Sequence, residues 1–196
     1  MALLRNRNLI LFFILPAAIF LAACQFCLIY SKKPLPDYGA FPDFKLVDQT
    51  GKAWTPSDLQ QTPWIASFIF TRCQGQCPII SSQMQQLGRT LGTARLVSFS
   101  VDPEFDKPEV LKVYAERFEA DPKLWTFLTG EREGVERVTR GLKMNGIDDP
   151  AFHSASLVLV DSKDRVRGYY DANDAERVKD LKQDWRRLGR RRFLLF

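Results

Sequence analysis

The sequence has little histidine and little cysteine, and it shows no internal repeat and no low-complexity segment. One histidine and four cysteines occur in 196 residues, and two of the cysteines lie in an apolar N-terminal run. An iron–sulfur centre, which needs about four protein ligands, is therefore disfavoured. The remaining length suits one compact domain of ordinary size.

A basic face is also missing, although the net charge of the chain is +5. The excess lies in one C-terminal cluster: Arg186, Arg187, Arg190, Arg191 and Arg192. Elsewhere Lys and Arg are not gathered along an element with aromatic residues between them, as nucleic-acid binding requires. We therefore expect no nucleic-acid partner, and we interpret residues 189–196 as a solvated basic tail.

Residues 1–30 have the pattern of a membrane anchor or a lipoprotein signal. Arginines precede a run from Leu9 to Tyr30 that is almost wholly apolar, and about 20 such residues span a bilayer as a helix. In the alternative, small residues precede Cys24 as in a lipobox, and Cys24 carries a lipid. Because the apolar run continues past Cys24, the anchor is favoured. Both interpretations place the domain at a membrane on the extracytoplasmic (periplasmic) side, behind a Pro-rich linker over residues 31–40.

From residue 41 to residue 188 the sequence alternates between strand-like and helix-like patterns. Apolar runs of strand length, each followed by a helical spacing of apolar residues, occur over residues 64–70, 94–101 and 124–130. A hairpin around Gly51 precedes them, and a second hairpin over 154–171 and a final helix follow. This order predicts a three-layer α/β domain with a central mixed sheet, whose first strands are parallel and covered on both faces.

Cys73 and Cys77 lie where the first of these runs ends and the next helix begins. In open α/β sheets, ligands bind at this edge. The residue before a proline avoids the helical conformation, so Pro78 predicts a helix that starts near residue 78 with Cys77 as its N-cap. Unpaired N–H groups at a helix N-terminus stabilise thiolates. Since neither cysteine belongs to the apolar stripe of the helix, we predict reactive thiols.

Three residues separate the two cysteines, whereas the dithiol motif of thioredoxin-like oxidoreductases has two. Such a loop can close a disulfide, and it can also hold two sulfurs around one metal ion. His153, the only histidine, adds a third candidate ligand just before a predicted strand. Two thiolates and one imidazole suit copper, while a catalytic zinc would need a general acid or base that the sequence does not place.

Three stretches of the sequence resemble the signatures of one family. FTRCQGQCPIISSQM, VSFSVDPEFDKPEVLKVYAERF and FHSASLVLVDSKDRVRGYYD are similar, in this order, to those of the Sco/SenC family of membrane-anchored, copper-binding proteins. The resemblance implies a thioredoxin-like fold and a role in assembly of the CuA centre of cytochrome c oxidase. It also implies that Cys73, Cys77 and His153 bind Cu(I) or Cu(II), and that Cys73 and Cys77 form a disulfide when oxidised.

The sequence departs from this family beside the cysteines. The family often has proline after the first cysteine and an acidic residue before the second, where Gln74 and Gln76 stand here. This leaves the site less negative and its loop more flexible. The three implied ligands are all present.

Two acidic residues of the second stretch need separate interpretations. Asp106 has the setting of an N-cap, with Pro108 in the first helical turn and Glu109 at the capping-box position. Asp102 is expected to be a turn residue. The alternative is that its carboxylate orients His153, because metal-bound imidazoles usually have such a partner.

Two functions from different classes follow. A copper metallochaperone would hold the ion on Cys73, Cys77 and His153 and pass it to cytochrome c oxidase subunit II or another copper-receiving protein. A membrane-anchored thiol:disulfide oxidoreductase would instead reduce the cysteines of that target, with Cys73 and Cys77 as its redox-active pair. Only the metallochaperone needs His153, so we expect the metallochaperone, with a copper donor or a thiol reductant as a further partner.

Overall fold

The computed structural model describes residues 17, 19–21, 34–60, 62–142 and 155–190. The chain divides into two units, Met1–Leu35 and Pro36–Phe196, and the strands belong to the second. Among the described residues, no helix is long and apolar enough to cross a membrane. Most of the predicted anchor over residues 1–30, with Cys24, lies outside the described residues, and so does His153.

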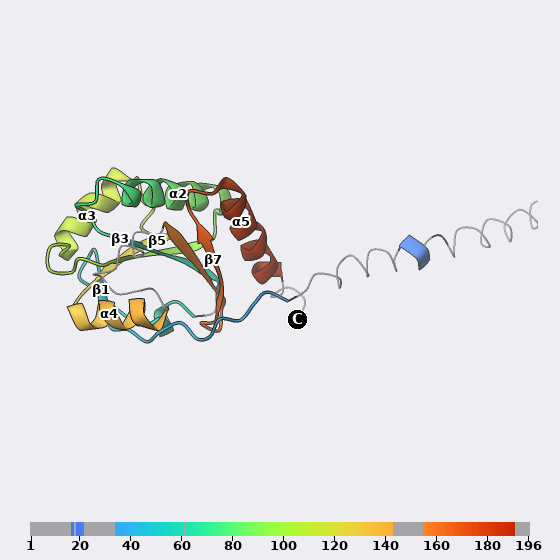
Figure 1. Ribbon diagram of the computed structural model, residues 1–196, viewed down its shortest axis with the longest axis horizontal. Coiled ribbons are helices and arrows are strands. Elements are labelled where there is room, and N and C mark those ends of the chain that lie inside the picture. Colours follow the sequence, from blue (N-terminus) through green and yellow to red (C-terminus); the bar gives the residue numbers. More distant parts are fainter. Residues whose placement is uncertain (1–16, 18, 22–33, 61, 143–154, 191–196) are drawn as a thin grey trace, which may run out of the picture. The chain divides into compact units, whose positions relative to one another are not determined.

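Strands and helices alternate along the second unit in the predicted order (Figure 1). The strands are β1 (Leu46–Asp48), β2 (Ala53–Trp54), β3 (Trp64–Ile69), β4 (Arg95–Ser100), β5 (Trp125–Thr129), β6 (Ser156–Val160) and β7 (Val166–Asp171). The helices are the 3-10 turn η1 (Pro56–Asp58), α2 (Gln76–Leu91), α3 (Pro108–Arg117), α4 (Arg132–Gly141) and α5 (Ala175–Arg190). The apolar runs and helical spacings of the sequence therefore predicted the type of each main element correctly.

The strands form one seven-stranded sheet in the order β2-β1-β5-β4-β3-β6-β7. β3 pairs with β4, and β4 with β5, in parallel, while the remaining pairs are antiparallel. The predicted hairpin around Gly51 joins β1 to β2, and the φ of +85° at Gly51 is one that glycine adopts readily. The sheet is therefore mixed, with a parallel centre, as the sequence predicts.

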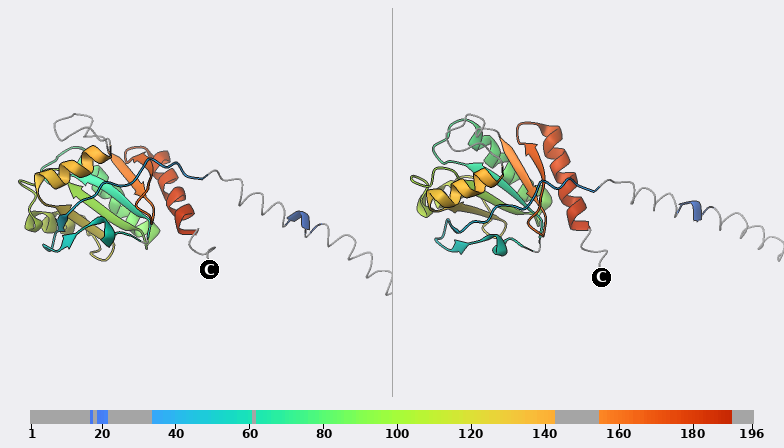
Figure 2. Two further views of the ribbon diagram at one scale, coloured as in Figure 1. Left: turned by 90° about the horizontal axis from the view of Figure 1, so that it is seen from below. Right: turned by 60° about the horizontal axis from the view of Figure 1, so that its bottom comes forward.

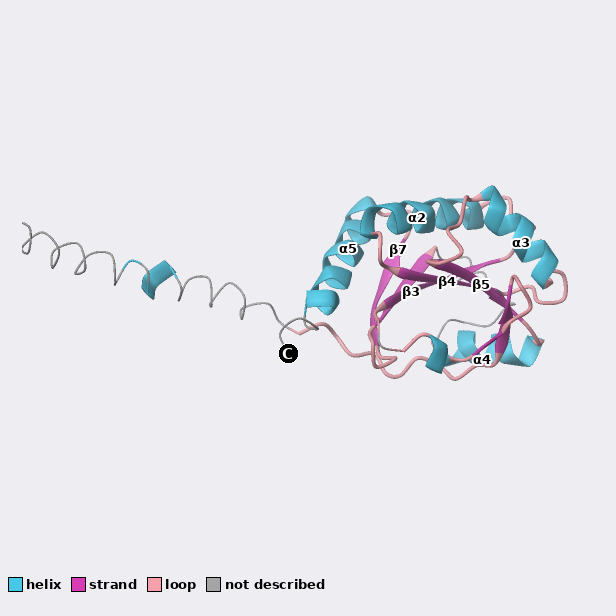
Figure 3. Ribbon diagram, turned by 180° about the vertical axis from the view of Figure 1, so that it is seen from behind, coloured by secondary structure: helices cyan, strands magenta, loops and turns pink. Residues whose placement is uncertain are grey.

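Helices cover both faces of this sheet. Helices α2 and α3 lie over one face and α4 lies over the other (Figures 1 and 3), and Figure 2 shows the domain from the α4 side. Side chains of β3 alternate between the faces, and Trp64, Ala66 and Phe68 join a core cluster that contains Val135 and Val138 of α4. The predicted three-layer α/β architecture is confirmed.

Aromatic rings fill the layer between the sheet and α4. The ring of Phe99, in β4, lies 5.8 Å from that of Phe41 and 5.4 Å from those of Phe44 and Phe68. Aromatic side chains bury large apolar areas, and such pairs add stability beyond that burial. This layer therefore fixes β3 and β4, the two strands whose carboxyl ends carry the candidate site.

Candidate dithiol site

The loop between β3 and α2 carries both predicted thiols. Cys73 lies in this loop and is half-buried, whereas Cys77 is the second residue of α2 and is only 5 % exposed. Both are free thiols. Because β3 is a central parallel strand, the loop lies at the carboxyl edge of the sheet, where the sequence predicts it.

Helix α2 begins at Gln76, earlier than the predicted start near Pro78, and its N-cap is Gly75 rather than Cys77. The prediction was wrong because the first four N–H groups of a helix have no partner within it, so a proline in the first turn loses no hydrogen bond. The bias against a helical residue before proline is a preference that this turn overrides. Cys77 is consequently held inside the first helical turn.

Backbone N–H groups point at both sulfur atoms. The N–H of Cys77 donates to Sγ of Cys73 at 3.4 Å, and the N–H of Phe70 donates to Sγ of Cys77 at 3.5 Å. The two thiols also make a hydrogen-bonding contact with each other. Donors of this kind favour the charged form of a sulfur that accepts from them.

The two thiols differ in acidity. Burial of Cys73 opposes its ionisation, but the N–H groups of Cys77, Gly75 and Gln76, together with the Cys77 thiol, outweigh burial and lower the pKa of Cys73. Burial is the main cause that raises the pKa of Cys77 to about 12, and the nearby negative charge of Cys73 and Asp106 adds to it. Cys73 is therefore the reactive sulfur and Cys77 the protected one. The prediction that neither cysteine belongs to the buried stripe of the helix is wrong for Cys77, which is buried with Ile80 and Met84 of α2.

Asp106 is fully buried beside the cysteine loop and accepts three hydrogen bonds. The N–H and the hydroxyl of Thr71 donate to it at 3.0 and 2.5 Å, and the hydroxyl of Ser100 donates at 2.6 Å. The predicted N-cap role of Asp106 is wrong, because the N-cap of α3 is Lys107. The sequence does hold a signal for the cluster: Thr71 and Ser100 are polar residues at the ends of two predicted parallel strands, which meet at one edge.

Arg72 links the cysteine loop to the same β4–α3 segment on the solvent side. Its guanidinium pairs with the Asp102 carboxylate at 2.5 Å and lies 4.3 Å from the centre of the Phe105 ring. The pair is partly exposed, with 58 % of the Arg72 side chain accessible, so it is worth little by itself. That Asp102 orients His153 stays a prediction, since His153 lies outside the described residues.

A hydrogen bond closes the other side of the loop. The side-chain amide of Asn173, between β7 and α5, donates to Oε1 of Gln76 at 3.0 Å. Gln76 is the first residue of α2, and this contact joins the start of that helix to the β7–α5 turn. The sequence identified Gln76 as a departure from the family but gave no signal for its partner.

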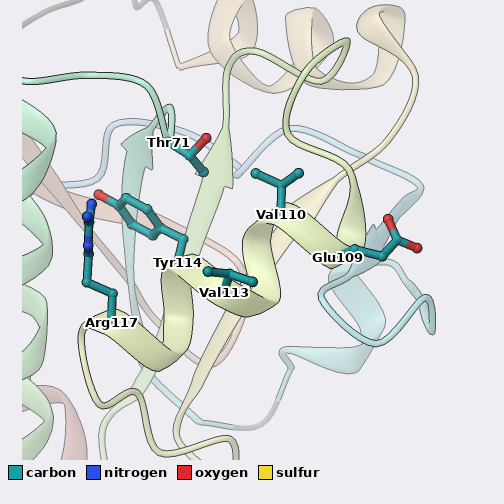
Figure 4. A pocket seen from close by; sticks show the side chains of 6 residues that line it. All are labelled: Thr71, Glu109, Val110, Val113, Tyr114 and Arg117. Atoms are coloured by element: carbon teal, nitrogen blue, oxygen red, sulfur yellow. The ribbon is translucent and has the colours of Figure 1, made fainter.

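A hollow of about 450 Å³ lies beside the cysteine loop, over α3 (Figure 4). It is lined by Thr71, Glu109, Val110, Val113, Tyr114 and Arg117. The hydroxyl of Tyr114 hydrogen-bonds with that of Ser81, in α2, at 2.9 Å. Since neither cysteine lines it, this hollow is separate from the candidate metal site.

Within the described ranges, no three or more His, Cys, Asp or Glu side chains are grouped so that they could hold a metal ion. The donor chemistry of the two sulfurs nevertheless fits copper, because thiolates select soft ions such as Cu(I) and hard cations take oxygen. The carboxylates of Asp102 and Asp106 already accept hydrogen bonds from Arg72 and from Thr71 and Ser100. The described part of the site therefore offers sulfur as its metal donor.

Comparisons with known proteins agree with this fold. The SCO1/SenC family model matches residues 34–188. The SCO1 protein homolog of Bacillus subtilis (strain 168) is 32% identical over 176 residues, which cover 85% of this chain and 89% of that protein.

Two solved structures extend the comparison. The structure of BsSco, described as a member of the Sco family of cytochrome c oxidase assembly proteins with a disulfide switch, has a TM-score of 0.71 and 29% identity, over 81% of this chain and 97% of that one. The structure of Bradyrhizobium japonicum ScoI with copper bound has a TM-score of 0.58 and 27% identity, over 74% and 99%. The mixed sheet matches these Sco structures, so the expected thioredoxin-like fold is confirmed.

Proposed function

The chain belongs to the SCO1/SenC family, and from this membership we propose that it is a copper metallochaperone. It binds Cu(I) or Cu(II) through Cys73, Cys77 and His153 and passes the ion by ligand exchange to a thiol-bearing partner. In this proposal the partner is cytochrome c oxidase subunit II or another copper-receiving protein, and the transfer assists assembly of a CuA centre. Copper is the cargo of the reaction.

The observation that carries the proposal is the pair of free thiols, in contact with each other at the carboxyl edge of the parallel strands. A soft ion that takes both sulfurs must displace the proton of Cys77, whose pKa is raised to about 12 by burial. Cys73, with its lowered pKa, offers the first thiolate. Copper affinity should therefore increase as the pH rises.

The place of the protein in the cell is part of the proposal. Residues 1–30 hold the domain at a membrane on the periplasmic side, either as a spanning helix or through a lipid on Cys24. A copper donor or a thiol reductant then reaches the same edge of the sheet from solution. The apolar run before the linker and the lipobox-like LAAC support this arrangement.

A second candidate function has its own support. An acidic, half-buried Cys73 and a buried, protonated Cys77 are the arrangement of a thiol:disulfide oxidoreductase, in which the first sulfur attacks a disulfide and the second resolves the mixed disulfide. In this alternative the chain reduces the cysteines of the copper site of its target. His153 has no role in that chemistry.

Metal analysis of the full-length chain in detergent tests the first function against the second. We expect one copper ion per wild-type chain and loss of copper in Cys73→Ser and Cys77→Ser. In His153→Ala the affinity for Cu(II) should also fall. The decrease should be larger than the about 10- to 100-fold decrease seen when a metal ligand loses only its hydrogen-bond partner. Disulfide exchange of His153→Ala with glutathione should stay close to that of the wild type.

Cys24→Ser is the matched control for loss of a cysteine, and it should retain copper. An unchanged Cu(II) absorption spectrum in His153→Ala would contradict the assignment of His153 as a ligand. If the wild-type protein exchanges disulfides but takes up no copper, the metallochaperone function is contradicted and the oxidoreductase function takes its place.

A further inference from the structure

We propose that Asp106 is a positioning residue that holds the cysteine loop in its dithiol form by clasping Thr71. The inference rests on the proposed function in one respect, namely that Cys73 and Cys77 work as a redox-active, copper-binding pair. Asp106 makes no hydrogen bond to either thiol, and the sequence marks it only as a helix cap. The clasp is defined as the two hydrogen bonds from Thr71 to the Asp106 carboxylate.

Burial makes the contacts of Asp106 strong. Its side chain is fully buried, and among the described residues its carboxylate accepts from Thr71 and Ser100 and pairs with no Lys or Arg. A buried carboxylate without a cation is costly unless hydrogen bonds satisfy its oxygens. These three bonds are therefore strong, charge-assisted contacts that the fold does not give up readily.

Thr71 lies where it can fix the cysteine loop. It donates both its N–H and its hydroxyl to the same carboxylate, and only Arg72 separates it from Cys73. The clasp thus fixes the backbone immediately before the reactive sulfur. Asp106 itself stands on the β4–α3 segment, which the aromatic core holds through β4. The loop is consequently tied to a rigid neighbour strand.

The contact between Arg72 and Asp102 is the obvious competitor for this role. It joins the same two segments, but 58 % of the Arg72 side chain and 24 % of the Asp102 side chain are exposed. Exposed pairs gain little because water and salt screen them and both side chains lose freedom. The buried clasp, rather than the exposed ion pair, is therefore the contact that sets the loop.

The clasp acts on the balance between the dithiol and the disulfide. Closing the disulfide brings the sulfurs from non-bonded contact to about 2.05 Å, with Cβ atoms about 3.8 Å apart. Cys77 lies inside helix α2 and is buried, so the loop before it has to make most of this movement. A clasp next to Cys73 opposes the movement and favours the dithiol, the form that binds copper.

The test uses the full-length chain in detergent with Cys24 and Cys27 changed to Ser, equilibrated in glutathione buffers. In this reaction the two thiols lose two electrons and two protons to oxidised glutathione, which leaves as two reduced molecules. Thr71→Val removes the hydroxyl bond but keeps the N–H and the shape of the side chain, and it avoids the unfolding that loss of the buried Asp106 carboxylate would risk. We expect the equilibrium constant for disulfide formation to rise about tenfold, equivalent to about 30 mV.

Two variants separate positioning from general stability. Thr71→Ser restores the hydroxyl, and its equilibrium constant should return to within about twofold of the starting protein. Ser100→Ala removes a bond to the same carboxylate outside the loop; it should lower the urea midpoint as Thr71→Val does but leave the disulfide equilibrium within about twofold. An unchanged equilibrium in Thr71→Val, or equal shifts in Thr71→Val and Ser100→Ala, would overturn the proposal. Copper content of the starting protein, measured in the same samples, reports separately on the proposed function.

Discussion

The backbone N–H of Cys77 donates to the sulfur of Cys73 across 3.4 Å, so the second cysteine of the pair supports negative charge on the first. This N–H is available because the first turn of a helix has no carbonyl to receive it. The same turn buries the sulfur of Cys77, and burial is the main reason that its pKa is raised. One short segment thus gives two chemically different sulfurs.

Iodoacetamide should therefore modify Cys73 before Cys77. The thiolate is the nucleophile, and Cys73 combines a lowered pKa with a half-exposed position. At pH 7, in a chain with Cys24 and Cys27 changed to Ser, we expect labelling at Cys73 to be at least about tenfold faster, measured by peptide mass spectrometry. As the pH is raised, the labelling rate at Cys73 should reach its plateau before about pH 8.5, which is the ordinary pKa of a cysteine.

Cys77→Ser is the control for this measurement, since serine keeps the backbone N–H that faces Cys73. Cys73 is then the only cysteine, and its labelling rate should stay close to its rate in the starting protein. Labelling of Cys77 first, or at the same rate, would show that the acidity of the pair is assigned the wrong way round.

The buried Cys77 also predicts a loss of stability at alkaline pH. Its pKa is raised to about 12 in the fold, so between about pH 8.5 and pH 12 the unfolded chain has lost this proton while the folded chain keeps it. The contribution of Cys77 to the free energy of unfolding is therefore fully present below about pH 8.5. Above that pH it falls by about 1.4 kcal/mol per pH unit. The lowered pKa of Cys73 acts in the opposite direction, but both states have lost that proton above about pH 8.5.

Urea denaturation at pH 8, 9 and 10 under reducing conditions measures this slope. In Cys77→Ser, residue 77 has no proton that titrates in this range. The free energy of unfolding of this variant should therefore fall less steeply, by about 1.4 kcal/mol per pH unit, whatever its value at pH 8. Equal slopes for the two proteins would contradict a protonated, buried Cys77. Burial, the main cause that raises the pKa of Tyr114 to about 12, acts in both proteins, so this contribution cancels in the comparison.

The type of each main element could be predicted from the sequence because local patterns determine it. The run at 64–70 is apolar at nearly every position, as a strand covered on both faces must be, and β3 is buried throughout. Helix starts were predicted less well. Pro78 and Asp106 each carry a local signal for a boundary. Helix α2 begins before Pro78 because a proline in the first turn loses no hydrogen bond. Asp106 is not the N-cap of α3, and its carboxylate accepts hydrogen bonds from Thr71 and Ser100 instead.

The place of the two cysteines in the fold could be predicted from the sequence, but the contacts that support them could not. Spacing and position predict that Cys73 and Cys77 lie together at the carboxyl edge of the sheet, and the structure has them there. That both bind copper stays a prediction. The contact of Asp106 with Thr71 spans 35 positions of the chain, and that of Asn173 with Gln76 spans 97, so neither follows from a local pattern. The difference in acidity between the thiols depends on burial, which only the folded structure supplies.

Gln76→Glu separates the two effects that a residue at the start of α2 can have. Gln76 is the first residue of the helix, and a carboxylate there should stabilise it by about 0.3–1 kcal/mol through the positive end of the helix dipole, with Asn173 still donating to the side chain. The same negative charge lies beside Cys73 and should raise the pKa of its thiol. We therefore expect a higher urea midpoint together with slower alkylation of Cys73 at pH 7.

Gln74→Glu is the matched control, because residue 74 precedes the helix and its carboxylate should slow alkylation without the gain in stability. Faster alkylation in Gln76→Glu would mean that the N–H groups of the helix start, rather than net charge, control the acidity of Cys73.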